Sequence, residues 1–337
     1  MKKLIPLLIL ILLLAACGDS TTDTRSEPED DAKLHVYTTV YPLTYFTERI
    51  GGEAVTVESI YPAGSNEHSF EPTQQDMIAL AEADLMFYVG LGLEGFIDSA
   101  QKTLKNENVE FVATADAITD EELVAATSHE EHHEGDAHDD ESHDEEAHDE
   151  EAHDEESHEG HDHGSTDPHV WISPVLSQKL AESIKDSLAE ADPENSEIFE
   201  SNYAELLIEL EDLDRSFAEL AEQADNKTFF VSHAAFGYMA EPYGLEQVAI
   251  AGLNSQDEPS QKELTEIVDL AKEKNIKHII FEQNVSSNLT EVIQKEVGAE
   301  ALEMNNLGVL TQENIDDEET YFTLMEKNLE TLKTALQ

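Results

Sequence analysis

The stretch 193–224, PENSEIFESNYAELLIELEDLDRSFAELAEQA, decides how the rest of the chain is interpreted. It carries one uninterrupted helical pattern, because no glycine and no further proline follows Pro193. Proline is favoured at the first helical position, so we expect a helix that begins at Pro193 and ends near Ala224. At a rise of 1.5 Å per residue this helix would be about 45 Å long, which is longer than one domain needs. The stretch therefore predicts a rigid connection between two folded halves.

On the N-terminal side of this helix, strand-like and helix-like segments alternate. The expected strands are rich in β-branched and aromatic residues and cover 33–40, 54–62, 84–90 and 109–114. The expected helices cover 43–51, closed by Gly51, then 73–83 with Thr73 as N-cap, 93–106 and 173–192. Strands that alternate with helices are typical of a parallel sheet in an α/β fold.

The C-terminal side repeats the alternation. Its expected strands cover 228–232, 245–251, 276–283 and a short segment near 301–305. Its expected helices cover 234–244, 259–275, 286–298 and a closing segment from about Asp317. We therefore expect an α/β fold of two lobes with parallel-type sheets, divided into an N-terminal lobe 33–191, a linker helix 192–224 and a C-terminal lobe 225–337. Ligands of such folds bind at the carboxyl ends of strands, which places the expected site in the cleft between the lobes.

The first residues are typical of a bacterial lipoprotein signal. Two lysines precede an apolar run that is too short to span a bilayer, and the run ends in LAAC at 14–17. We expect residues 1–17 to be the signal peptide and lipobox, with cleavage before Cys17 and lipidation of its sulfur. Cys17 is the only cysteine, so no internal disulfide is expected. The polar stretch 18–32 is interpreted as a flexible tether to a lipid anchor on the extracytoplasmic face of the cell membrane.

The chain is strongly acidic along its whole length. Its formal net charge is −58, and the segment from His129 to His163 holds 18 acidic residues without Lys or Arg, which leaves −40 for the rest. Such a charge argues against nucleic acid as a partner. It suits either a surface that attracts cations or a protein that is exposed to high salt or high pH.

The acidic segment 128–166 also contains ten of the fifteen histidines. Its HDEEA repeat matches neither a helix face nor a strand face, and it has almost no apolar side chains, so it predicts a disordered loop. The loop is interpreted either as a solvated spacer or as a device for metal capture. We favour capture, because neutral imidazole binds zinc. The weak accessory metal ligands would then be His129, His132, His133, His138, His143, His148, His153, His158, His161 and His163.

Four side chains outside this loop lie where expected strands end. His233 and Glu282 close two strands, His68 lies in a loop after a strand, and His169 follows the acidic loop directly. Three imidazoles and one carboxylate form a ligand set that suits tetrahedral Zn²⁺. The two remaining histidines lie inside or before strands and are expected to be structural: His35 and His278.

Four motifs resemble those of a known family: HSFEPT at 68–73, DPHVWISP at 167–174, SHAAFGYMAEPYGL at 232–245 and FEQNVSS at 281–287. They are similar to the motifs of the metal-binding solute receptors of bacterial ABC importers (cluster A-I), and most of all to those of the zinc receptors. The resemblance covers about 34–337.

The resemblance assigns roles to individual residues. It implies that His68, His169 and His233 are the three histidine ligands and that Glu282 is the acidic fourth ligand. Manganese members of the family carry a carboxylate where His233 stands, so a third imidazole favours zinc. Asn66-Glu67 replaces the usual Asp-Pro before His68, which alters the geometry of that loop.

The resemblance also implies a function. We expect a high-affinity receptor that binds Zn²⁺ outside the cytoplasm and passes it to the permease of an ABC importer and, through the permease, to its ATPase. The alternatives are a manganese or iron receptor of the same family, and a metal-buffering or adhesin lipoprotein. A zinc hydrolase ranks last, because three histidines with an open position can activate water but only Glu282 itself could act as a general base. Ser232-His233 lacks the G-x-S-x-G motif and an oriented acid, so an enzyme is not expected.

Overall fold

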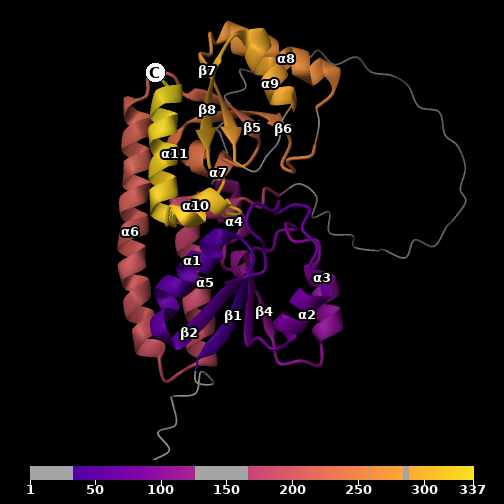
Figure 1. Cartoon of the computed structure of the whole chain (residues 1–337). Coiled ribbons are helices and arrows are strands. Elements are labelled where there is room, and N and C mark those ends of the chain that lie inside the picture. The colour runs from indigo at the N-terminus through magenta and orange to yellow at the C-terminus, as the bar shows by residue number, and fades with distance from the viewer. Residues whose placement is uncertain (1–32, 126–165, 258, 284–287) are drawn as a thin grey trace, which may run out of the picture. The chain divides into compact units, whose positions relative to one another are not determined.

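Two four-stranded parallel sheets organise the part of the chain that the structure describes (Figure 1). The computed structural model describes residues 33–125, 166–257, 259–283 and 288–337. Cys17, the tether and all ten histidines of the acidic loop lie outside these ranges, so what we expect of them stays a prediction. Lys33–Gln337 form one compact unit, and no helix in its described ranges is long and apolar enough to cross a membrane.

The N-terminal sheet has the strand order β2-β1-β3-β4, and all its strands run parallel. Its strands are β1 (Leu34–Thr38), β2 (Val55–Ser59), β3 (Leu85–Tyr88) and β4 (Glu110–Ala113). The helices of this half are α1 (Tyr41–Gly51), α2 (Gln74–Ala81), α3 (Ile97–Leu104), α4 (Asp120–Ala125) and α5 (Pro174–Ala191). Of these elements, only the short helix α4 was not expected from the sequence.

Local sequence explains where helix α2 begins and where helix α1 ends. Thr73 caps α2, because its side chain accepts from the Asp76 backbone N–H while the Asp76 carboxylate accepts from the Thr73 N–H. Helix α1 ends at Gly51, but the C-cap is Gly52, with a positive φ of +53°, one position later than expected. Gly51 serves close packing instead, since a Cβ there would collide with the methyl groups of Val55.

The C-terminal sheet repeats the topology with the order β6-β5-β7-β8, again all parallel. Its strands are β5 (Thr228–His233), β6 (Glu246–Ala251), β7 (His278–Glu282) and β8 (Glu300–Met304). Its helices are α7 (Gly237–Ala240), α8 (Gln261–Glu273), α9 (Asn288–Val297), α10 (Gln312–Asp316) and α11 (Tyr321–Ala335). The expected two-lobed α/β class is therefore confirmed.

The prediction of a helix over 234–244 is wrong in extent. Only α7 is α-helical, and a 3-10 turn, Glu241–Tyr243, follows it. Pro242 has no N–H to donate to a helix, and Gly244, with φ +69°, reverses the chain before β6. The segment is therefore a tight connection between neighbouring strands.

The long helix α6 (Ser196–Gln223) runs beside both lobes (Figure 1). It begins later than expected, because Pro193 lies in a turn that the Asn195 N–H closes on the Asp192 carbonyl. Proline suits the second position of such a turn as well as the first turn of a helix, so local sequence does not separate the two. The remaining helix is still about 42 Å long at 1.5 Å per residue.

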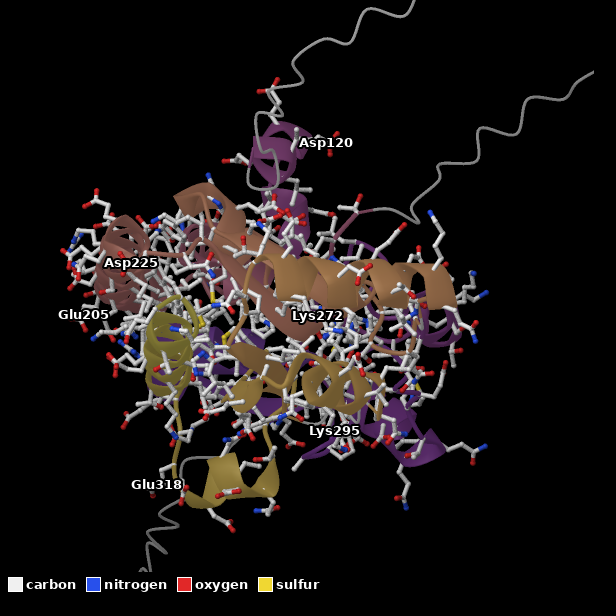
Figure 2. The ribbon with its side chains drawn as sticks, turned by 90° about the horizontal axis from the view of Figure 1, so that it is seen from above. Asp120, Glu205, Asp225, Lys272, Lys295 and Glu318 are labelled. Atoms are coloured by element: carbon white, nitrogen blue, oxygen red, sulfur yellow. The ribbon has the colours of Figure 1, made fainter. Side chains whose placement is uncertain are left out.

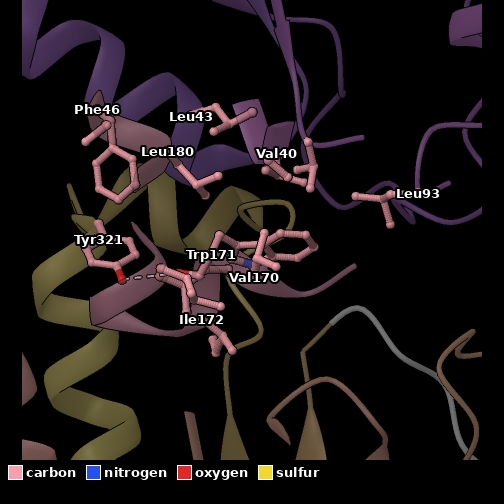
Figure 3. Close-up of a cluster of buried hydrophobic side chains, with 14 of the residues drawn as sticks. Val40, Leu43, Phe46, Leu93, Val170, Trp171, Ile172, Leu180 and Tyr321 are labelled. Atoms are coloured by element: carbon pink, nitrogen blue, oxygen red, sulfur yellow. Dashed lines mark hydrogen bonds between the residues drawn. The ribbon is translucent and has the colours of Figure 1, made fainter. Parts of the chain in front are cut away.

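The largest apolar core spans both halves of the fold. Trp171 is fully buried in it, with Tyr321 of α11 and Phe46 of α1 close by (Figure 3). The Tyr321 hydroxyl donates to the Trp171 carbonyl at 3.2 Å, and the Trp171 Nε1–H donates to the Asn306 carbonyl at 2.7 Å. These bonds satisfy the polar atoms that the large aromatic side chains bring into the core. They also fix the backbone two residues after His169.

Charged side chains cover the outside of the described residues. The labelled acidic residues Asp120, Glu205, Asp225 and Glu318 are exposed, as are the labelled lysines Lys272 and Lys295 (Figure 2). Both lysines are paired with carboxylates, with Glu296 and Glu291 respectively, so they add little net positive charge to the acidic surface.

Candidate metal centre

Three histidines from distant parts of the chain meet at one point. His68 lies in the loop after β2, His169 precedes the 3-10 turn Val170–Ile172, and His233 is the last residue of β5. One ring nitrogen of each lies within 4.8 Å of the other two. The Nε2 atoms of His169 and His68 are 3.2 Å apart. The sequence predicted all three positions, and the fold brings them together as a group that could hold a metal ion.

Two of the three rings are each oriented by a carboxylate. Asp167 Oδ1 lies 2.7 Å from His169 Nδ1 and also accepts from the His169 backbone N–H at 2.9 Å. Glu282 Oε2 lies 2.7 Å from His233 Nδ1. A carboxylate at Nδ1 holds the proton there and leaves the Nε2 lone pair free for a metal.

His233 Nε2 is buried and has no hydrogen-bond partner among the described residues. A buried polar atom without a partner is costly, and such atoms occur where a ligand or ion binds. The unpartnered nitrogen faces away from Glu282 because Nδ1 takes that contact. The chemistry of this donor set, three imidazole nitrogens with carboxylates behind them, fits Zn²⁺.

The charge states of the histidines differ. Burial, helped by the nearby His169 and His233, lowers the pKa of His68 to about 3. Burial also disfavours the charged form of His233, but its contact with Glu282 outweighs this and raises the pKa of His233. His68 therefore presents a neutral imidazole without losing a proton, whereas a metal must displace a proton held more firmly at His233.

Glu282 lies behind His233 rather than within the three-histidine group. Its Oε1 accepts from the Ser232 hydroxyl at 2.8 Å and from the His233 backbone N–H at 3.0 Å. Its Oε2 accepts from His233 Nδ1 and, at 3.3 Å, from Asn306 Nδ2. These contacts use both oxygens of the Glu282 carboxylate as hydrogen-bond acceptors. A direct bond from Glu282 to a metal stays a prediction.

Sequence reasoning did not assign a role to a second buried carboxylate, that of Glu67. Only 5% of this residue is exposed, and its Oε1 accepts from Asn306 Nδ2 at 2.9 Å. Burial raises the pKa of Glu67, while the nearby His169 and His233 act in the opposite direction. The sequence contained one indication of this, the replacement of Asp-Pro by Asn66-Glu67. It marked the loop as unusual but did not show that Glu67 points inward.

The remaining histidines of the described ranges lie apart from the metal group. His35 is the second residue of β1 and His278 is the first residue of β7, so both lie near the amino ends of parallel strands. The group lies at the carboxyl ends, where His233 closes β5. Neither His35 nor His278 belongs to a cluster of potential metal ligands within the described residues.

The fold and the site together define a two-lobed α/β protein in which three histidines form a candidate metal centre. Residues 36–335 match the profile of the family described as "Zinc-uptake complex component A periplasmic" (ZnuA), and the chain belongs to this family.

Relatives and a solved structure agree with the family assignment. The chain is 37% identical over 325 residues to the "High-affinity zinc uptake system protein ZnuA" of Bacillus subtilis, a match that covers 96% of this chain and 94% of that protein. It is 36% identical to the "Zinc-binding lipoprotein AdcA" of Streptococcus pneumoniae, where the match covers 96% of this chain but only 60% of AdcA. The fold is similar to the Zn(II)-bound ZnuA-like domain of Streptococcus pneumoniae AdcA, with a TM-score of 0.67, 34% identity, and coverage of 90% of this chain and 99% of that domain.

Proposed function

We propose that this protein is an extracytoplasmic receptor that binds Zn²⁺ with high affinity and delivers it to an ABC-type importer. The observation that carries the proposal is the convergence of one nitrogen from each of three histidines within 4.8 Å. Zinc is the cargo of this site, so the site must both hold the ion and release it. The names of the relatives, a zinc uptake protein and a zinc-binding lipoprotein, support the same cargo.

The proposed ligands are the Nε2 atoms of His68, His169 and His233. The carboxylates of Asp167 and Glu282 lie beside His169 and His233. Glu282 is proposed as the acidic group of the site, which either binds the ion at the fourth position or orients His233. Three imidazoles and one further position make the tetrahedral set that zinc prefers. We propose binding without catalysis, in keeping with a family of uptake components.

We propose that the permease of the importer is the direct partner and that the ATPase is reached through it. Cys17 is the proposed lipid attachment site, with 1–17 as signal peptide and 18–32 as tether, so that the receptor stays at the outer face of the membrane. The lipoprotein AdcA supports this arrangement by its name. The proposed working parts are the N-terminal lobe 33–191, the linker helix 192–224 and the C-terminal lobe 225–337.

The histidines of the acidic loop 128–166 are proposed as weak, interchangeable zinc ligands that supply the central site. The loop ends close to His169 in sequence, so zinc held on it would be present at roughly mM effective concentration near the site. This role is accessory, because the three-histidine group forms without any residue of the loop.

Zinc titration of two variants tests the proposal against its alternatives. The variant H233A should lose the tight site, whereas deletion of 129–163 should keep it and lose only weak additional zinc. Loss of tight binding in the deletion variant would place the site in the loop and contradict the proposal. Displacement of Zn²⁺ by an equal concentration of Mn²⁺ or Fe²⁺ would instead support a receptor for those metals.

Transport itself needs a separate measurement in cells. Zinc accumulation should fall when H233A replaces the wild-type protein and should stay near normal with the loop deletion at high external zinc. A surface adhesin or a zinc buffer predicts unchanged zinc uptake in both variants, and that result would overturn the transport role.

A further inference from the structure

Asn306 lies between the two buried carboxylates that flank the histidines. Its Nδ2 donates to Glu67 Oε1 at 2.9 Å and approaches Glu282 Oε2 at 3.3 Å. Glu67 comes from the loop after β2 in the N-terminal lobe, and Glu282 ends β7 in the C-terminal lobe. The amide has two N–H groups, so it can serve both carboxylates at once.

Other bonds fix the orientation of this amide. Asn306 Oδ1 accepts from the Gly308 backbone N–H at 2.9 Å, which leaves Nδ2 as the atom that faces the carboxylates. The Asn306 carbonyl accepts from Trp171 Nε1 at 2.7 Å, two residues after the ligand His169. Only 6% of Asn306 is exposed, so water competes little for these bonds.

Gly308 also packs closely against the Glu67 carboxylate. A Cβ at Gly308 would lie 2.5 Å from Glu67 Oε1 and 2.8 Å from its Cδ, so any side chain there would displace the Glu67 carboxylate from its present position. The Gly308 carbonyl also accepts from the Tyr41 N–H at 3.0 Å, so the segment that leaves β8 is bound to the start of α1. The backbone around Asn306 is therefore shaped to receive the Glu67 carboxylate from the opposite lobe.

Two buried carboxylates near one site repel each other unless donors or cations separate them. The Asn306 amide is a donor that touches both of these carboxylates. Its removal would leave the two carboxyl groups without the donor between them and free to move apart.

We propose that Asn306 is a positioning residue of the metal site, whose amide holds Glu67 and Glu282 at a fixed spacing behind the three histidines. The proposal rests on the proposed zinc-binding function and adds a residue that touches no metal. Because the two carboxylates come from different lobes, the same amide also ties the lobes together while zinc is bound. Loss of the amide should therefore weaken zinc binding mainly by faster dissociation.

The test is a double-mutant cycle of N306D, E67Q and N306D/E67Q in the full-length protein. N306D replaces the donor by a carboxylate and should raise the zinc dissociation constant about 10- to 100-fold, as loss of groups that orient metal ligands does. In the double variant the new amide at position 67 supplies the donor and the new carboxylate at position 306 the acceptor, so part of the affinity should return relative to N306D. If E67Q changes the zinc dissociation constant by the same factor in the wild type and in N306D, the two residues are not coupled, and the proposal is overturned.

N314D is the matched control. Asn314 is also buried, at 4% exposure, and follows β8, but its Oδ1 accepts from the Thr311 N–H and contacts neither Glu67 nor Glu282. N314D adds the same charge and should leave the zinc dissociation rate unchanged. Co²⁺ bound in place of zinc gives a second readout: its visible absorption bands should shift in N306D and not in N314D.

The outcomes separate this inference from the function it rests on. If the wild-type protein lacks a tight zinc site, the proposed function fails. If the wild type binds tightly and N306D keeps its affinity and cobalt spectrum, only the role of Asn306 fails. Should N306D not fold, N306S removes the amide without adding charge, and an unchanged zinc dissociation rate in N306S would overturn the proposal.

Discussion

His233 Nδ1 lies 2.7 Å from Glu282 Oε2, and neither side chain is accessible to solvent. This contact fixes the tautomer of His233 and directs Nε2 toward the other two histidines. We expect E282A to weaken zinc binding about 10- to 100-fold without abolishing it, because the three nitrogens remain. Titration against a competing chelator measures the change.

E303Q is the control for this prediction, since Glu303 lies on the neighbouring strand β8 but is exposed. Its zinc affinity should equal that of the wild type. A loss in E282A far beyond about 100-fold, together with a changed cobalt spectrum, would identify Glu282 as a direct ligand. An unchanged affinity in E282A would contradict both roles.

Asp167 should support zinc affinity in a similar way, because it orients His169. Its Oδ1 receives both the ring and the backbone N–H of His169, at 2.7 and 2.9 Å. D167A should weaken zinc binding about 10- to 100-fold, and D167N should do so less because the amide oxygen still accepts both bonds. Isothermal titration of the two variants compares them. Equal losses would mean that the charge of Asp167, and not its hydrogen bonds, supports the site.

The sequence predicted the strand-end residues well because the rule behind them is local. A run of aromatic and β-branched residues ends at His233 and another at Glu282, and parallel strands bring their carboxyl ends to one edge of the sheet. The chain order of strands and helices then fixed the class of the fold. The start of α6 was misplaced because Pro193 fits a turn and a first helical position equally well.

Glu67 and its partner Asn306 could not be predicted in the same way. Glu67 and Asn306 are 239 positions apart, and no periodicity relates them. Nothing local shows that Asn306 turns inward, since asparagine after a strand is common in exposed turns. The long-range packing of the β8–α10 connection against the His68 loop decides it.

The pKa of His68, lowered to about 3, makes the zinc-free protein sensitive to acid. Between the ordinary histidine pKa of 6.5 and about 3, the unfolded chain binds a proton at His68 that the folded protein does not bind. The free energy of unfolding should therefore fall as pH falls through this range, and His68 should contribute nothing to the slope above it. H68Q should lose less stability than the wild type between pH values of about 7.5 and 5.

Chemical denaturation of chelator-treated protein measures this difference. The wild type also contains His233, whose raised pKa acts in the opposite direction: the stability it contributes is present below pH 6.5 and is lost as pH rises through the folded pKa. Comparison with H68Q cancels that contribution because His233 is present in both proteins. Equal losses of stability on acidification would show that His68 is not held neutral by the fold.

Helix α6 should prevent a large closure of the lobes when zinc binds. Asn202 donates to the Ile50 carbonyl of α1 at 2.9 Å, and Arg49 pairs with Glu209, so the N-terminal half of α6 is bound to the N-terminal lobe. Farther along, Asp214 accepts from the Tyr243 hydroxyl at 2.6 Å on the other lobe. No glycine or proline interrupts α6, so it offers no point at which a kink would form.

Small-angle scattering of a variant that lacks residues 129–163 of the acidic loop tests whether the lobes close when zinc binds. Curves of the zinc-free and zinc-loaded protein should superimpose, because the two lobes are bound to one continuous helix and release then needs only small shifts of loops such as that of His68. Marked compaction on loading would mean that the lobes move as rigid bodies about a hinge. In that case α6 would have to bend or one of its attachments would have to break, and Y243F, which removes the bond to Asp214, should change the extent of the compaction.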